Sequence, residues 1–224
     1  MEKGREFIRW DEKRREYENQ TGPVRKGIGM AIFCYKTGVY PISLETASCR
    51  MILNQDGSMQ LQMGATEIGQ GADTVFTQMA AEVTGITEDK VNVLSTQDTD
   101  VSPFDTGAYA SRQTYVSGMA VKKTGAIFKE KILDYAAYML EKPQDTLDVR
   151  DNHIVDKETG TQLLPMEELA TTAFYSLDRS VHITAEVTNQ CKDNTFSSGC
   201  CFVEIEVDIP LGLVTVKDII NVHD

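Results

Sequence analysis

The sequence predicts an α+β fold, in which mixed sheets are joined by hairpins and by helical crossovers. One observation is a strong hairpin signal at Asp56-Gly57 between two strand-like runs, because both turn residues tolerate positive φ. A second is the succession of strand, amphipathic helix and strand between residues 59 and 97. A chain that mixes these two patterns belongs to the α+β class.

Three sections are expected along the chain. Residues 1–22 read as a charged helix and linker, with few apolar positions in the helix. Residues 23–142 form a first lobe, and Pro143 opens a second α+β section, 143–224, which we expect to be truncated at its C-terminal end.

The first lobe begins with strands. One is predicted at Gly29–Tyr35, and two more lie within Ala47–Ala65 on either side of the hairpin turn. A helix follows and ends at Gly85. Its expected core-facing stripe consists of Val75, Met79 and Val83, with Phe76 and Ala80 beside it. A strand at Lys90–Gln97 completes the strand–helix–strand unit.

A second long helix is predicted from Thr114 to Leu140. Gly118 and Gly125 lie within it and indicate a close approach between helix and sheet. The apolar residues of one side are Val121, Phe128, Ile132, Tyr135 and Met139.

The second section repeats the mixture of strands and helix. Its predicted elements are strands around Asp151-Asn152, a helix at Pro165–Phe174, a strand at Ser180–Val187 and a long hairpin at Gly199–Asp224 that turns about Pro210–Gly212. In that hairpin Glu204 and Glu206 alternate with apolar residues, which is typical of a half-exposed strand.

Composition excludes several classes of function. The 224 residues carry a net charge of -12, which argues against a nucleic-acid partner because such proteins need a concentrated basic face. No apolar run approaches the length needed to cross a bilayer, and the charged start is not a secretory signal. The five cysteines are odd in number and lack metal-ligand spacing. Reduced thiols and a cytoplasmic protein are therefore expected.

The glycine-rich turn "GATEIGQGAD" is the first candidate site. Gly64, Gly69 and Gly71 permit unusual backbone geometry, and no Cβ would block a ligand there. The helix that follows directs free N–H groups and its positive end at the turn, which favours an anion, while Gln70 suits the edge of a heterocycle. Neither the P-loop nor the dinucleotide fingerprint fits. A tight turn without a ligand is the alternative.

The loop Asp98–Gln113 is the second candidate, because it is long and rich in special residues. A calcium loop fails, since Pro103 and Tyr109 stand where glycine and glutamate are required. Ser111, Arg112 and Gln113 could instead hydrogen-bond an anion or a pterin-like ring, just before a helix. An irregular surface loop is the alternative here. The histidines show no metal-ligand spacing, and we expect no metal ligand in this chain.

Three segments, Gly64–Ile86, Ser95–Gly118 and Phe202–Asp224, resemble the molybdenum hydroxylases, and among them the molybdenum-binding subunit of xanthine dehydrogenases. The resemblance runs from about Lys26 to Asp224. It implies part of a molybdopterin-binding domain, in which the protein provides no ligand to the metal.

By this resemblance, the cofactor is molybdopterin with molybdenum, alone or extended by a cytosine dinucleotide. The residues expected to bind it are Gly69, Gln70, Gly71, Ala110, Ser111, Arg112 and Gln113. Iron–sulfur clusters and FAD are expected on partner subunits or domains, in an enzyme that is an oligomer and oxidises a purine C–H with oxygen derived from water.

The family's catalytic glutamate would lie beyond Asp224, and Glu67 is not its equivalent. We therefore expect this chain to be an internal fragment of a longer subunit, and to be inactive alone. Three alternatives stay open: a related hydroxylase acting on nicotinate or an aldehyde, a cofactor-binding module without catalysis, and a purely structural domain.

Overall fold

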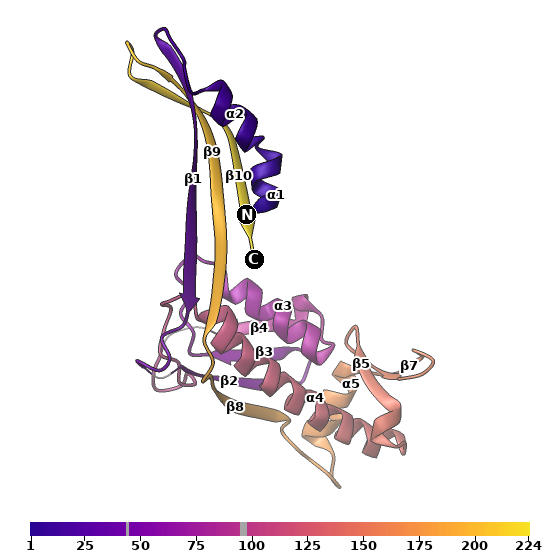
Figure 1. Ribbon diagram of the computed structural model, residues 1–224. Coiled ribbons are helices and arrows are strands. Elements are labelled where there is room, and N and C mark those ends of the chain that lie inside the picture. The colour runs from indigo at the N-terminus through magenta and orange to yellow at the C-terminus, as the bar shows by residue number, and fades with distance from the viewer. Residues whose placement is uncertain (44, 95–97) are drawn as a thin grey trace. The chain divides into compact units, whose positions relative to one another are not determined.

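The computed structural model describes residues 1–43, 45–94 and 98–224. Contacts divide the chain into two compact units, the first made of Met1–Thr37 with Asn194–Asp224 and the second of Gly38–Asp193. Both contain helices and sheets (Figure 1), which confirms the α+β class. The sections expected from the sequence, with boundaries after residues 22 and 142, stay a prediction.

The first unit contains a three-stranded antiparallel sheet in the order β1 (Val24–Thr37), β9 (Thr195–Asp208), β10 (Leu213–His223). The predicted C-terminal hairpin is confirmed, and Gly212 adopts a φ of 65° in its turn. Strand β1 extends well beyond the predicted Gly29–Tyr35, because it pairs with β9 along its whole length.

The charged N-terminal segment forms two helices instead of the single one predicted. They are α1 (Glu2–Phe7) and α2 (Trp10–Glu16), separated where Arg9 takes a left-handed φ of 58°. This break lets Ile8 become fully buried, and it places the Trp10 ring 5.6 Å from that of Phe202 on β9. Ile8, Trp10 and Tyr17 thus pack against the sheet in a cluster with Phe202, whereas Phe7 stays 73% exposed.

The alternation along β9 predicted that Glu204 points into solvent. In the structure its side chain is buried instead, and the residue is only 7% exposed. Its carboxylate accepts hydrogen bonds from Lys13 Nζ on α2, at 2.5 Å, and from the Tyr17 hydroxyl, at 2.6 Å. These donors, Lys13 foremost, hold the pKa of Glu204 below its ordinary value. Burial and the neighbouring carboxylate raise the pKa of Tyr17.

The second unit is built on a four-stranded sheet in the order β4 (Val91–Leu94), β3 (Met59–Met63), β2 (Thr46–Leu53), β8 (Thr184–Gln190). Strand β2 is antiparallel to β3 and β8, and β3 is parallel to β4. Helix α3 (Ala72–Thr84) joins β3 to β4, which confirms the strand–helix–strand unit. The last three residues of the predicted β4, 95–97, lie outside the described residues.

Helix α3 uses a different stripe from the predicted one to face the core. Phe76 and Ala80 are buried, whereas Val75, Met79 and Val83 are only half-buried. A second helix, α4 (Gly118–Leu140), packs against α3, and its Gly118 and Gly125 lie beside Met79 and Val83.

The contact between α3 and α4 depends on two glycines of α4. A Cβ at Gly118 would lie 2.8 Å from Met79 Sδ, and one at Gly125 would lie 2.8 Å from Val83 Cγ1. The sequence predicted a close approach of α4 to the sheet. The closest atoms belong instead to the neighbouring helix, because both helices lie over the same sheet (Figure 1).

A smaller antiparallel sheet completes the second unit: β5 (Leu147–Arg150), β6 (His153–Asp156) and β7 (Gln162–Pro165), followed by α5 (Met166–Tyr175). The predicted turn at Asp151-Asn152 is confirmed by its positive φ angles, 48° and 60°. Strand β7 was not predicted from the sequence. Short 3-10 turns precede β4 and β5, at Glu88–Lys90 and Gln144–Thr146.

Candidate functional site

The first predicted turn runs from the end of β3 to the start of α3. Gly64 is required by packing, because a Cβ there would lie 2.0 Å from the carbonyl oxygen of Pro103. Gly69 and Gly71 have φ angles of 95° and 83°, and nothing lies within 4 Å of the position a Cβ would take. These two glycines therefore leave open space beside the main chain.

Glu67 occupies the amino end of α3. Its carboxylate accepts hydrogen bonds from the backbone N–H groups of Gly69, at 2.7 Å, of Gly71, at 3.2 Å, and of Asp73, at 3.1 Å. The Asp73 bond is the main reason that the pKa of Glu67 is lowered. The expected free N–H groups are thus already paired with an anion of the chain itself. A ligand at this turn would be bound by other groups.

The second predicted turn has a left-handed backbone without glycine at its centre. Ala110 and Ser111 adopt φ angles of 46° and 55°, which is a costly conformation for residues with a Cβ. The Ala110 carbonyl accepts a hydrogen bond of 2.8 Å from Gly38 N–H, and Arg112 N–H donates to the Tyr109 carbonyl at 3.1 Å. The side chain of Ser111 is exposed.

The two turns meet through a pair of glutamines. The Gln70 side-chain amide donates to Gln113 Oε1, and both amides donate to the carbonyl of Thr66, at 3.0 Å and 2.9 Å respectively. The oxygen of Gln70 accepts from Ile68 N–H at 2.7 Å and keeps one acceptor site. Gln113 is buried and Gln70 is exposed. The structure therefore brings the two predicted segments into one polar site.

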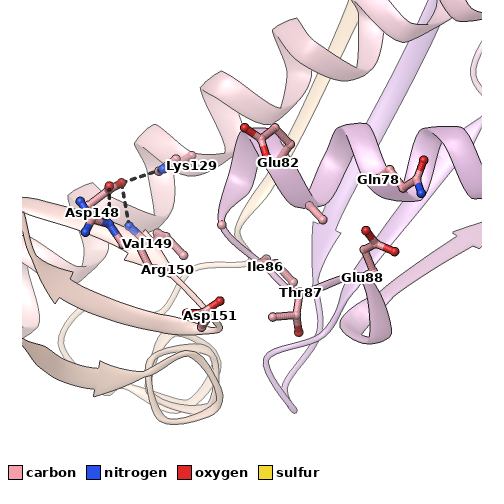
Figure 2. Close-up of a pocket in the computed structure, with 12 residues that line it drawn as sticks. Gln78, Glu82, Ile86, Thr87, Glu88, Lys129, Asp148, Val149, Arg150 and Asp151 are labelled. Carbon is pink, nitrogen blue, oxygen red and sulfur yellow. Dashed lines mark hydrogen bonds and ion pairs between the residues drawn. The ribbon is translucent and has the colours of Figure 1, made fainter. Parts of the chain in front are cut away.

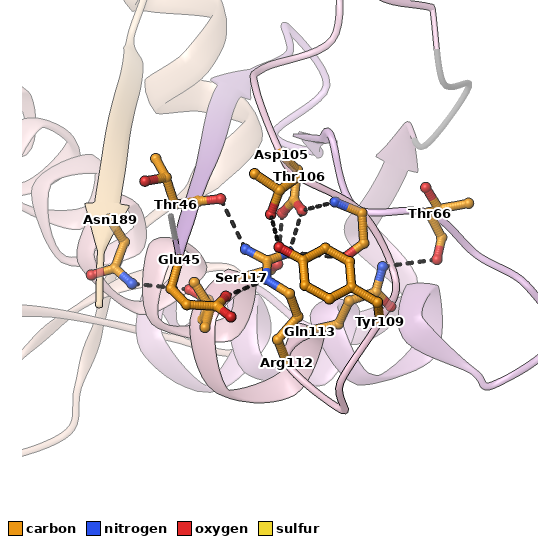
Figure 3. Close-up of polar contacts among 12 residues, drawn as sticks. Glu45, Thr46, Thr66, Asp105, Thr106, Tyr109, Arg112, Gln113, Ser117 and Asn189 are labelled. Carbon is orange, nitrogen blue, oxygen red and sulfur yellow. Dashed lines mark hydrogen bonds and ion pairs between the residues drawn. The ribbon is translucent and has the colours of Figure 1, made fainter. Parts of the chain in front are cut away.

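Arg112 points inward, into a cluster of buried charges (Figure 3). Its guanidinium donates to Glu45 at 2.6 Å, to Asp105 at 2.5 Å and to the backbone carbonyls of Gly107, at 2.9 Å, and Thr46, at 2.8 Å. The Arg112 side chain is 0% exposed and that of Glu45 is 2% exposed. Arg112 is thus occupied with the protein itself, whereas the sequence predicted it as a cofactor ligand.

The charges of the cluster compensate one another. Burial lowers the pKa of Arg112, but the hydrogen bond to Glu45 and the charge of Asp105 outweigh burial and leave the pKa above its ordinary value. The guanidinium is therefore charged and paired, as buried ions must be.

The seven predicted residues thus differ in accessibility. Gly69, Gln70 and Ser111 are exposed, while Gly71 and Ala110 are half-buried. Arg112 and Gln113 are buried. Sequence reasoning missed Glu45, because no local pattern connects it with Arg112, 67 positions away.

Among the described residues, no group of three or more His, Cys, Asp or Glu side chains is arranged to hold a metal ion. Within the same part of the chain, no helix combines the length and the hydropathy that a bilayer-spanning segment needs.

A cavity of about 620 Å³ lies elsewhere in the second unit, between the carboxyl end of α3 and strand β5 (Figure 2). Its wall carries charges of both signs, among them Glu82, Glu88 and Lys129. None of the predicted site residues lines it.

A sequence profile of the molybdopterin cofactor-binding domain matches residues 3–224. The chain belongs to this family. The chain is also 45% identical, over 225 aligned positions, to the xanthine dehydrogenase molybdenum-binding subunit of Escherichia coli O157:H7, a match that covers 100% of this chain and 30% of that protein. The carbon monoxide dehydrogenase large chain of Afipia carboxidovorans is 26% identical over 223 positions, covering 94% of this chain and 27% of that one.

Solved structures of the same fold exist. Carbon monoxide dehydrogenase from Oligotropha carboxidovorans superposes with a TM-score of 0.83 at 23% identity, over 100% of this chain and 30% of that one. Quinoline 2-oxidoreductase from Pseudomonas putida 86 superposes with a TM-score of 0.81 at 20% identity, over 98% of this chain and 30% of that one. These matches confirm the predicted fold. This chain spans about 30% of the length of the xanthine dehydrogenase subunit.

Proposed function

We propose that this chain is the cofactor-holding part of a xanthine dehydrogenase-like molybdenum hydroxylase, and that the turns 66–71 and 109–113 together bind the molybdopterin. The observation that carries the proposal is the contact of Gln70 with Gln113, which joins the two turns in one polar site. Membership of the molybdopterin cofactor-binding domain family indicates which ligand such a site would take.

The groups available to the cofactor fit a polar heterocycle better than a bare phosphate. Gly69 and Gly71 leave the main chain open to close approach. Gln70 would accept a hydrogen bond from a ring N–H with its remaining lone pair, and Ser111 would offer a hydroxyl. Glu67 already neutralises the helix end, so an anionic group would be repelled there.

When bound, the molybdenum and pterin would supply the two-electron oxidation of a C–H bond with oxygen derived from water. The chain's own residues would hold and orient the group, and none of them is proposed as a catalytic base. Arg112 and Gln113 would act from beneath the surface, since both are buried.

The substrate, the form of the cofactor and the partners are also proposals. The 45% identity to a xanthine dehydrogenase subunit supports a purine over nicotinate or an aldehyde. A cytosine dinucleotide form of the pterin, and FAD and iron–sulfur partners in a cytoplasmic oligomer, follow from the resemblance to the molybdenum hydroxylases.

The test uses the longer subunit that contains this chain, produced in cells able to make the cofactor. We expect the Q70L variant to lose most of its molybdenum, measured by mass spectrometry of the metal, and its pterin, measured by fluorescence after release. Q78L is the matched control, because Gln78 is an exposed glutamine of α3 that lies outside both turns.

Three results would separate the alternatives. Equal loading of wild type and Q70L would contradict the proposed site. A wild type without pterin would favour the structural domain. A loaded protein that oxidises neither xanthine, nicotinate nor aldehydes would favour a binding module. The 224-residue chain alone should oxidise none of them, and xanthine turnover by it would contradict the expectation of a base outside this chain.

A further inference from the structure

The cluster around Arg112 connects three stretches of chain that are distant in sequence. Glu45 lies just before β2, Asp105 lies in the long loop, and Arg112 lies within the second turn, 109–113. The guanidinium donates to both carboxylates and to the carbonyls of Thr46 and Gly107. Every part of its hydrogen-bonding fork is therefore directed at the segments that border the turn.

Asp105 and Glu45 also accept hydrogen bonds from other segments of the chain. Asp105 accepts from the Ser117 hydroxyl at 2.7 Å and from Gly107 N–H at 2.9 Å. Glu45 accepts from Val39 N–H at 2.5 Å, and its own carbonyl accepts from Cys191 N–H at 2.8 Å. The start of α4 and the loop before β2 are thus tied to the same guanidinium.

The turn above the cluster needs such support. Ala110 and Ser111 hold consecutive left-handed conformations, and a conformation of this kind persists only where surrounding contacts impose it. The Tyr109 ring lies over the guanidinium, with 5.4 Å between its centroid and Arg112 Cζ. Gln113, which contacts Gln70, follows directly.

We propose that Glu45, Asp105 and Arg112 are positioning residues, which hold the turn 109–113 in the one conformation able to bind the cofactor. They act through Ala110, Ser111 and Gln113 and do not touch the cofactor themselves. This inference rests on the proposed function, since it assumes that the turn is a binding element.

The experiment compares R112K with R50K in the longer subunit. Lysine keeps the charge but cannot reproduce the fork of Arg112. Arg50 is the matched control, because it pairs with Glu186 at 2.7 Å in the same unit, on β2, and is 35% exposed. Two quantities are measured: molybdenum per folded protein, and hydrogen exchange of the amides of residues 107–113 in the cofactor-free protein.

We expect R112K to lower the molybdenum content, and to raise exchange at residues 107–113, by about tenfold or more each, because charge-assisted bonds are lost. Exchange in the middle of α4 should stay within about twofold of wild type, and R50K should change neither quantity. EPR of the molybdenum that R112K retains should show an altered signal, since a displaced turn alters the surroundings of the group.

Two results would overturn the inference. One is unchanged loading and unchanged local exchange in R112K. The other is exchange that rises equally throughout the unit, which would mean that the cluster serves global stability. A wild type without molybdenum would refute the proposed function and the cofactor part of this inference together. Local exchange in R112K would still decide whether the cluster holds the turn.

Discussion

Helix α3 offers a test of the packing, because it has a glycine in the same conformation at each end. Gly71 precedes the helix with a φ of 83°, and Gly85 ends it with a φ of 82°. A Cβ at Gly71 would meet nothing within 4 Å, whereas one at Gly85 would lie 2.1 Å from the carbonyl oxygen of Val149 on β5. Alanine at the two positions therefore isolates the effect of that one contact.

The expected magnitude follows from two contributions. A left-handed alanine costs about 1–2 kcal/mol, partly offset by about 0.4–1 kcal/mol from the stiffer unfolded chain. This sum applies to both G71A and G85A. The collision with the Val149 carbonyl adds overpacking, which costs about 1–3 kcal/mol, to G85A alone.

Thermal unfolding of the two variants, followed by circular dichroism, measures the difference. One kcal/mol corresponds to about 2–4 °C in a chain of this size, so the additional cost of about 1–3 kcal/mol should make G85A melt about 2–12 °C below G71A. Equal melting temperatures would show that β5 does not press against the end of α3, and would refute the reasoning.

Three further predictions concern the two units. Because the pKa of Glu204 is lowered in the folded state, its ionised carboxylate stabilises the fold above about pH 4.3, and this contribution is lost as the pH falls further. In E204Q, the free energy of unfolding, followed by the fluorescence of the single tryptophan, should therefore depend less on pH below about 4.3. The same pH dependence in E204Q and wild type would contradict this. G125A should lower the free energy of unfolding, measured in urea, by about 1–3 kcal/mol, and G118A should lower it by less. The reason is that a Cβ at Gly125 meets the stiff side chain of Val83, whereas one at Gly118 meets the flexible side chain of Met79. A larger loss in G118A than in G125A would be inconsistent with the contact between the helices. Burial raises the pKa of Cys49 to about 12, so iodoacetamide at pH 8 should label the exposed Cys34 and spare Cys49 until the protein unfolds, and equal labelling would disprove the burial.

Local patterns in the sequence predicted most of the elements of the fold. The hairpin at Asp56-Gly57, helix α3 with its end at Gly85, and the C-terminal hairpin all lie where turn and period signals placed them. The ends of some elements differ from the predicted ones, because pairing with a distant strand determines where these elements begin. Strand β8 begins four residues later than predicted, at Thr184, because its register is set by β2.

The environment of the polar side chains could not be predicted in this way. Glu204 was expected in solvent, but a helix from the other end of the chain covers it. Arg112 was expected to face a ligand, but its partners are Glu45 and Asp105. Charge pairs between distant segments leave no periodic signal, so the sequence located the turns without showing which of their side chains face outward.

The most direct test of the central claim is a crystal structure of the cofactor-loaded longer subunit, with anomalous data collected at the molybdenum edge. The account predicts pterin density in contact with Gln70 and Ser111, beside the open main chain at Gly69 and Gly71, and Arg112 still enclosed between its two carboxylates. Pterin density that contacts neither turn would contradict it.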